Sequence, residues 1–230
     1  MDIDMKAQHL KLMDEEKKYY LLIQKVFGVL APFYDLVTIP ISRVRDKVVV
    51  LTSAAKGSRI LDVATGTGQQ AFAFGQRGYE VVGIDLSEAM LRVAKRKNKY
   101  GNVRFEVADA TNLTFKNSSF DVSCVSFALH DMPLNVIRKT LREIVRVTRP
   151  NGKIVIVDYG LPKNRFGRFL VYRFVRLYEG QYYIKFIRYD LEDLVTTSGT
   201  NIEERISALL GAARIITGVK GDHGPQLRKF

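Results

Sequence analysis

Two glycines and an acidic residue stand where a strand would present them to a ligand. The stretch ILDVATGTGQQAFAFG, residues 60–75, runs from an apolar strand through Gly66 and Gly68 into a helix. A glycine turn there lets a ligand approach the backbone and meet the N–H groups of the helix start. Asp85 follows Gly66 by nineteen residues and ends the next apolar run, as a ribose-binding acid should. These residues predict a cofactor site and leave a nicotinamide dinucleotide open beside other cofactors.

His130 is the best candidate for a catalytic base. It lies in SFALHDMP, directly after an apolar run. A histidine titrates near neutral pH and can take a proton from a hydroxyl group. The alternative is that it only fixes the loop or contacts the cofactor. Asp131 beside it can orient the imidazole or cap a helix that begins near Pro133, and we favour the cap.

The elements that must position these residues alternate between apolar strands and helices. Strands are expected in SRILDVA, YEVVGIDL, VRFEVAD, FDVSCVSFA and GKIVIVDY, with helices between them at about 68–77, 87–98 and 134–148. Strands that are apolar on both faces and alternate with helices form a parallel sheet with right-handed crossovers. The sequence therefore predicts an α/β doubly wound domain.

The two ends of the chain depart from this alternation. Helices are expected at about 6–30 and 41–55, before the first strand. After a helix at about 191–198, two β-like runs meet near Gly211 and predict an antiparallel hairpin at the sheet edge.

Composition favours one domain with attachments, since the chain has 230 residues and 47% of them are hydrophobic. We divide it into an N-terminal helical segment over the cofactor site, 1–56, and a cofactor-binding domain, 57–230, with an insertion at about 161–189. The single cysteine, Cys124, excludes an internal disulfide. It lies inside a strand without an activating cation, so we expect it in the core.

Metal ligands and membrane signals do not stand out in the sequence. His9, His130 and His223 lack the spacing of zinc ligands. No apolar run reaches the length of a membrane span, and the polar start is unlike a secretory signal. We therefore expect a cytoplasmic protein without a bound metal.

Three further features identify a family. Asp62 precedes the glycines, Asp109 ends the third strand in VADATNL, and a Pro-Asn-Gly turn leads into the fifth strand. Together they resemble the class I S-adenosylmethionine-dependent methyltransferases over about residues 26–220. The resemblance implies a Rossmann-like doubly wound sheet of seven strands with an antiparallel last strand, N-terminal helices and a helical insertion after strand five. It also implies S-adenosyl-L-methionine as the cofactor, because nicotinamide domains lack the final antiparallel hairpin.

Within that class, two stretches resemble the ubiquinone/menaquinone-biosynthesis C-methyltransferases. VFGVLAPFYDLVTIPIS is similar to their N-terminal segment through Tyr34 and Asp35, and RVTRPNGKIVIVDYG resembles their second signature. The usual Glu-x-Ser ending of that signature is Asp-Tyr-Gly here, from Asp158 onward. The family's Arg-Asn after strand four is replaced by ALHDMP.

The resemblance implies roles for the residues around the glycines. Ala64, Gly66 and Gly68 would line the methionine portion of the cofactor. Asp62 would steady that loop or meet the amino group. Tyr34 would either reach the cofactor carboxylate or serve as a core aromatic.

The acids at the strand ends would hold the nucleoside. Asp85 would accept both ribose hydroxyls, since one carboxylate offers two oxygens. Asp109, with the backbone of Ala110, would accept the adenine amine, and Leu86 and Met90 would pack on the adenine faces. Asp85 as a helix N-terminal acid and Asp109 as a turn former are the alternatives. The full set of expected cofactor contacts is Tyr34, Asp62, Ala64, Gly66, Gly68, Asp85, Leu86, Met90, Asp109, Ala110 and Ser126.

The net charge of +12 is concentrated in residues 138–188, which contain thirteen Lys or Arg and three acidic residues. Within them, NRFGRFLVYRFVRLYEGQYYIKFIRYD predicts a helix with arginines on one arc and aromatics on the other. This segment could be a lid over an apolar acceptor, a membrane-surface contact or an RNA-binding face. We favour a lid formed by 166–189, because aromatics outnumber what charge neutralisation requires.

We therefore expect a methyltransferase that acts on a small, apolar or quinone/lipid-like acceptor. An RNA methyltransferase that uses residues 138–188 is one alternative, and a cofactor-binding protein without catalysis is another. The expected partner is a small-molecule acceptor; nucleic acid ranks lower, and peripheral membrane contact stays open.

Overall fold

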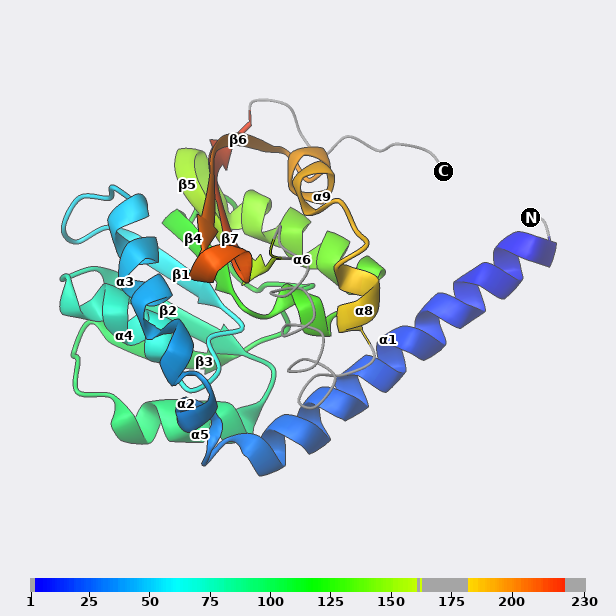
Figure 1. Ribbon diagram of the computed structural model, residues 1–230, viewed down its shortest axis with the longest axis horizontal. Coiled ribbons are helices and arrows are strands. Elements are labelled where there is room, and N and C mark those ends of the chain that lie inside the picture. Colours follow the sequence, from blue (N-terminus) through cyan, green and yellow to red (C-terminus); the bar gives the residue numbers. More distant parts are fainter. Residues whose placement is uncertain (1–2, 161, 163–181, 222–230) are drawn as a thin grey trace.

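The computed structural model of the chain describes residues 3–160, 162 and 182–221. Within these residues, seven strands form one mixed sheet in the order β3-β2-β1-β4-β5-β7-β6 (Figure 1). Strands β1 to β5 run parallel, and β7 is antiparallel to β5 and β6. The strands are β1 Arg59–Val63, β2 Glu80–Asp85, β3 Val103–Val107, β4 Phe120–Ser126, β5 Thr148–Tyr159, β6 Thr200–Ala208 and β7 Ala213–Lys220. The predicted doubly wound sheet with its antiparallel last strand is confirmed.

Helices cover both faces of this sheet because successive strand residues are apolar on both sides. In β1, Ile60 belongs to one core cluster and Leu61 to the other. The first cluster takes up α3 (Ser42–Leu51), α4 (Gln69–Gln76) and α5 (Glu88–Lys97). The second takes up α6 (Leu134–Val147), α8 (Tyr183–Phe186), α9 (Leu191–Thr197) and part of α1 (Ile3–Leu30). Short elements join them: α2 (Tyr34–Val37), η1 (Ile39–Ile41), η2 (Leu129–Asp131) and η3 (Leu209–Gly211).

The switch point of the sheet lies between β1 and β4, where the strand order reverses. Chains leave β1 and β4 toward opposite faces there, which opens a crevice at the carboxyl ends of the strands. The glycine loop after β1 and η2 after β4 both lie at this edge. The predicted site residues are thus carried to one end of the sheet.

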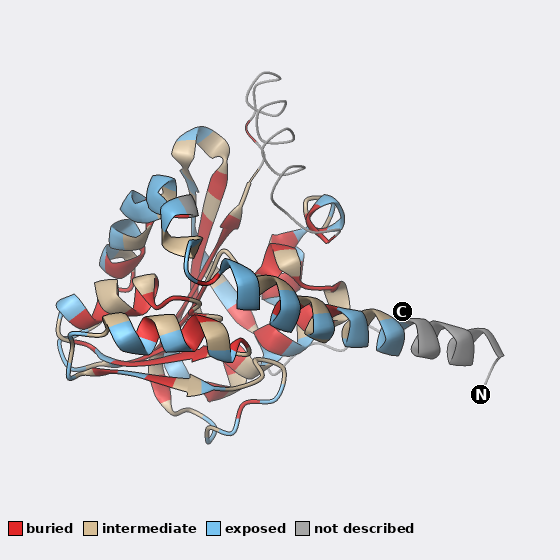
Figure 2. Cartoon of the chain, turned by 90° about the horizontal axis from the view of Figure 1, so that it is seen from below, coloured by how far each residue is buried: buried red, intermediate tan, exposed pale blue. Residues whose placement is uncertain are grey.

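The N-terminal helix α1 extends away from the body of the domain (Figures 1 and 2). Its later turns are docked, since Tyr19 and Ile23 are buried in the second core cluster. Glu16 pairs with Lys139 of α6 at 2.7 Å, and Glu15 pairs with Lys185 of α8 at 2.6 Å. The expected helix at 6–30 is therefore present, and it forms one side of the crevice.

Strand β5 begins earlier than the sequence predicts. The Pro-Asn-Gly segment lies inside the strand as a bulge, because the pairing with β4 jumps from Phe120–Thr148 to Val122–Lys153. Asn151 takes a left-handed φ of 57°, which asparagine tolerates better than most residues. The predicted turn before strand five is thus an irregularity within it.

The remaining expectations concern Cys124, the basic and aromatic helix, the domain boundaries and membrane spans. Cys124 is fully buried in the core, as predicted, and burial raises the pKa of its thiol. The predicted basic and aromatic helix lies outside the described residues except for its last part, 182–190. The boundaries 1–56 and 57–230 stay predictions. In the described part of the chain, no helix combines the length and the hydropathy that crossing a membrane requires.

Candidate active site

Two adjoining cavities meet at the glycine loop. The large cavity, about 700 Å³ with its open mouth, lies between the ends of β1–β4 and helix α1. The small cavity, about 470 Å³ measured in the same way, lies between the loop and the α2–α3 segment. Tyr34, Ala64, Gly66 and Phe127 line both.

The two glycines of the loop do different work. Gly66 has a φ of 56°, and a Cβ atom there would meet only the Tyr34 ring, at 3.9 Å. Space beside Gly66 is therefore open to a ligand. Gly68 has a φ of 85°, and its Cβ would lie 2.7 Å from the Phe105 ring. Gly68 is not among the residues that line either cavity, so its described role is the close packing of α4 on the sheet.

Asp85 connects the glycine loop to the next strand. Its Oδ2 accepts a hydrogen bond from the Gly66 N–H and its Oδ1 one from the Ser87 N–H, both at 2.8 Å. Burial raises the pKa of this carboxyl, and the backbone donors oppose that rise. Each carboxylate oxygen can accept more than one hydrogen bond. Asp85 lines the large cavity and so combines the expected acceptor with the alternative helix-end role.

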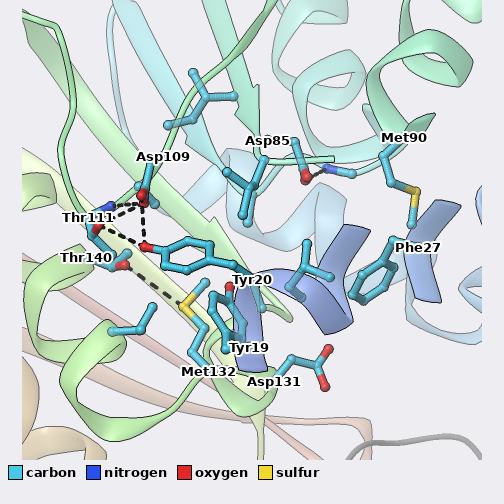
Figure 3. Close-up of a pocket in the computed structure, with 18 of the residues that line it drawn as sticks. Tyr19, Tyr20, Phe27, Asp85, Met90, Asp109, Thr111, Asp131, Met132 and Thr140 are labelled. Carbon is cyan, nitrogen blue, oxygen red and sulfur yellow. Dashed lines mark hydrogen bonds between the residues drawn. The ribbon is translucent and has the colours of Figure 1, made fainter. Parts of the chain in front are cut away.

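Asp109 is contacted by a side chain from α1. Its Oδ1 accepts from the backbone N–H and the hydroxyl of Thr111, both at 2.8 Å, and its Oδ2 accepts from the Tyr20 hydroxyl at 2.8 Å. Figure 3 shows the Tyr20 ring reaching across the cavity to Asp109. Burial raises the pKa of Tyr20 to about 12, so the phenol stays protonated at neutral pH and donates a hydrogen bond to Asp109. The expected acceptor of the adenine amine therefore already holds a donor.

The small cavity contains the groups that an amino acid requires. Gln70 Oε1 is buried, and no hydrogen-bond partner for it occurs among the described residues. Asp62, 1% exposed, accepts from the Thr65 hydroxyl, and burial raises its pKa to about 7. Arg45 of α3 lines the same cavity. An unpaired acceptor, an acid and a guanidinium in one cavity match an ammonium and a carboxylate, so the residues present fit the methionine end of the expected cofactor.

Asp35 links the N-terminal segment to the glycine loop and to α5 beside the small cavity. Its carboxylate accepts from the Thr67 hydroxyl in the glycine loop and pairs with Lys97 of α5. Tyr34 lies at the border of the two cavities, with its ring edge-on to Phe27 at 6.0 Å. The Tyr-Asp pair thus joins the N-terminal segment to the loop.

His130 lies behind the large cavity. It is 4% exposed, and its Nδ1 is 2.7 Å from Asp158 Oδ1, while its Nε2 is 3.4 Å from Asp131 Oδ2. His130 is not among the lining residues, whereas Asp131 is. The favoured capping role of Asp131 is wrong: α6 has Pro133 at its N-cap and no side-chain cap. Asp131 belongs to the preceding turn η2, where its carboxylate lies beside the imidazole.

Most of the expected cofactor contacts converge on the two cavities. The expected contacts that line the large cavity are Tyr34, Ala64, Gly66, Asp85, Leu86, Met90, Asp109 and Ala110, and the further expected contacts that line the small one are Asp62 and Ser126. Sequence reasoning missed Tyr20, Arg45 and Gln70. Helical spacing of Tyr20, Ile23 and Phe27 could have indicated one face of α1 turned to a common surface. Among the described residues, no group of three or more His, Cys, Asp or Glu side chains could hold a metal.

The fold is that of S-adenosylmethionine-dependent methyltransferases. A putative methyltransferase from Bacillus halodurans has a TM-score of 0.61 at 19% identity, over 77% of this chain and 98% of that one. Phosphoethanolamine N-methyltransferase 2 from Haemonchus contortus, solved with S-adenosyl-L-methionine, has a TM-score of 0.61 at 21% identity, over 78% and 53%. A family profile described as a methyltransferase domain matches residues 60–152.

Sequence relatives narrow this class. The demethylmenaquinone methyltransferase of Thermus thermophilus is 38% identical over 64% of this chain and 70% of its own length. That of Renibacterium salmoninarum is 38% identical over 64% and 62%, and the ubiquinone/menaquinone biosynthesis C-methyltransferase of Azotobacter vinelandii is 33% identical over 62% and 60%. The match thus spans less than two thirds of the latter two relatives. The chain belongs to the family of demethylmenaquinone and ubiquinone/menaquinone C-methyltransferases, whose cofactor is S-adenosylmethionine.

Proposed function

We propose that this protein transfers a methyl group from S-adenosylmethionine to an apolar, quinone-like acceptor. One observation carries the proposal: the large cavity continues from Asp85 and Asp109 into a part lined by apolar side chains of α1, η2 and α6. These are Tyr19, Ile23 and Phe27 of α1, Met132 directly after η2, and Val136 of α6. A flat aromatic ring system can bury its faces there at roughly 25 cal/mol per Å² of apolar surface.

The cofactor would lie across both cavities. Asp62, Gln70 and Arg45 would hold its amino-acid end, and Asp85 and Asp109 its nucleoside. When bound, it supplies a methyl group on a positively charged sulfur, which is already a good leaving group. The work left to the protein is therefore to align the acceptor and to exclude water.

The acceptor class is inferred from relatives and from the cavity together. The names of the relatives include demethylmenaquinone methyltransferase, and an apolar wall of aromatic and aliphatic residues suits such a ring. Most of the lid expected at 166–189 lies outside the described residues. The described end of that segment contributes Tyr183 and Phe186, which are buried beside His130 of η2, and Tyr182, which packs on Tyr19 of α1. His130 keeps a proposed part in the proton transfer through its contact with Asp131, since the imidazole itself does not line the cavity.

A direct assay tests the acceptor. The purified protein is incubated with S-adenosylmethionine and a short-chain demethylmenaquinol kept reduced, and mass spectrometry follows the methylated quinol and S-adenosylhomocysteine together. We expect the two products in equal amounts. Binding of S-adenosylhomocysteine without methylation of the quinol would contradict the acceptor class, and salt-sensitive methylation of RNA would replace it with the RNA alternative.

A further inference from the structure

We propose that Asp131 is the residue that takes the proton from the methyl acceptor, and that His130 and Asp158 form a relay behind it. The inference rests on the proposed function for the identity of the acceptor. Its observations come from the structure of this chain and not from the relatives, since the family's Arg-Asn after strand four is replaced here by ALHDMP. Here the structure holds a chain of three side chains that ends at the apolar part of the large cavity.

Asp158 forms the inner end of the chain. It is fully buried, and its carboxylate accepts from the backbone N–H groups of Leu129 at 2.9 Å, His130 at 3.3 Å and Tyr159 at 2.7 Å. Several N–H donors stabilise an ionised carboxylate. His130 Nδ1, at 2.7 Å, therefore donates to Asp158 Oδ1. This bond fixes the ring, and it leaves Nε2 facing Asp131.

The outer end of the chain is the only one of the three that reaches the ligand space. The Asp131 side chain is 25% exposed and lines the large cavity, and Figure 3 shows it close to Tyr19. The His130 ring is enclosed by Tyr159, Tyr183 and Phe186, whose ring centroids lie 4.7, 6.1 and 6.3 Å from its own. An acceptor in the cavity thus meets Asp131 before it meets the imidazole.

The surroundings of Asp131 make its carboxylate more basic than an exposed aspartate. Burial raises the pKa of its carboxyl, the negative charge of Asp158 raises it further, and His130 lowers it. Other titratable groups face the three side chains Asp131, His130 and Asp158. They are Tyr19 of α1, Tyr159, Tyr183 of α8 and Arg214 of β7. A carboxylate with a raised pKa is a better proton acceptor than an ordinary one. Its base form is present above its pKa, so turnover should rise with pH through that value.

The proton step balances without a further reactant. The O–H bond of a hydroquinone breaks, its electron pair stays on the ring oxygen, and the proton goes to an Asp131 oxygen. When the imidazole is neutral, with its Nδ1–H donated to Asp158, the protonated Asp131 carboxyl can donate to His130 Nε2. The oxygen pair makes the ring carbon nucleophilic toward the methyl group. After transfer, that carbon loses its hydrogen as a proton and the oxygen regains one, so one proton is released for each methyl group.

Asp131→Asn tests the inference, because the amide keeps the size of the side chain and cannot accept the proton. With a short-chain demethylmenaquinol as acceptor, turnover should fall by about a hundredfold or more, as expected for loss of a general base. The acid limb of the pH–rate profile should vanish, and S-adenosylhomocysteine should bind in calorimetry as it binds to wild type. Asp131→Glu should restore part of the turnover. Asp14→Asn, an exposed site on α1, is the matched control with wild-type turnover.

Wild-type turnover and an unchanged pH profile in Asp131→Asn would overturn the inference. If wild-type protein does not methylate the quinol at all, the proposed function fails instead, and a second measurement still tests the chain. In NMR titrations of the histidine rings, with His130→Gln used for assignment, Asp131→Asn should move the His130 titration to lower pH because it removes a negative neighbour. An unmoved titration would show that the two side chains are not coupled and would overturn the relay.

Discussion

The two cavities share the glycine loop and differ in what lines the rest of them. The small cavity presents Asp62, Gln70 and Arg45, which recognise by hydrogen bonds and charge. Beyond Asp109, the large cavity presents apolar rings and chains, which recognise by buried area. A site built from unpaired polar groups rejects a ligand that lacks their partners, whereas an apolar wall discriminates weakly between similar ligands. The comparison predicts strict selection of the cofactor and tolerance toward the acceptor.

The largest effect is expected at Asp85, which serves both cavities through its bond to Gly66. Asp85→Ala removes the proposed ribose acceptor and leaves the Gly66 and Ser87 N–H groups unpaired. The affinity for S-adenosylhomocysteine should fall by about 1–3 kcal/mol, which calorimetry measures. Circular dichroism must show a folded variant. A folded variant with wild-type affinity would mean that Asp85 only shapes the loop.

Of the two cavities, Arg45 lines only the small one, so its substitution should affect the two ends of the cofactor differently. Arg45→Met keeps an unbranched apolar stem and removes the guanidinium, so S-adenosylhomocysteine should bind roughly tenfold more weakly, as for a lost bond to a charged group. Methylthioadenosine, which has no amino-acid end, should bind with unchanged affinity. Arg43→Met, an exposed neighbour on α3, is the control. Equal losses for both ligands would show that Arg45 stabilises the fold around the loop and does not recognise a carboxylate.

Asp62 adds a pH dependence to the same cavity. Its pKa is raised to about 7 by burial, so it is neutral below that pH and negatively charged above it. If it meets the cofactor ammonium, the affinity for S-adenosylhomocysteine should drop severalfold as pH falls from 8 to 6, since the charged form is lost as the proton binds. Binding titrations between pH 8 and 6 compare S-adenosylhomocysteine with methylthioadenosine, whose affinity should not change with pH. A pH dependence common to both ligands would place the titrating group elsewhere.

The smallest effect is expected on the large-cavity side. Tyr20→Phe removes the hydroxyl that occupies Asp109 and frees an oxygen for the adenine amine. The affinity for methylthioadenosine should rise by up to about fivefold, the size of one net hydrogen bond. Tyr189→Phe, another half-buried tyrosine, serves as the control. A weaker affinity in Tyr20→Phe would show that the hydroxyl supports the bound nucleoside.

The sequence predicted the parts of the site that depend on local order. A strand, two glycines and a helix determine the loop, and the acid at the end of β2 must lie beside it because parallel neighbours end at the same edge. The contacts missed are those made across the fold: Tyr20 and Asp109 are 89 residues apart, and His130 and Asp158 are 28 apart. Such pairings depend on how helices dock, which no local pattern specifies. Asp131 was assigned to the wrong partner for the same reason.

The docking of helix α1 should affect how long a ligand stays in the large cavity. The helix has 28 residues, about 42 Å at the usual rise per residue, and its docked turns supply a wall of the large cavity. It is held there partly by the pairs Glu15–Lys185 and Glu16–Lys139, which are open to solvent on at least one side. Added salt screens such pairs. The residence time of a bound nucleoside should therefore shorten as ionic strength rises, because weaker ion pairs let the later turns of α1 undock from the domain more often.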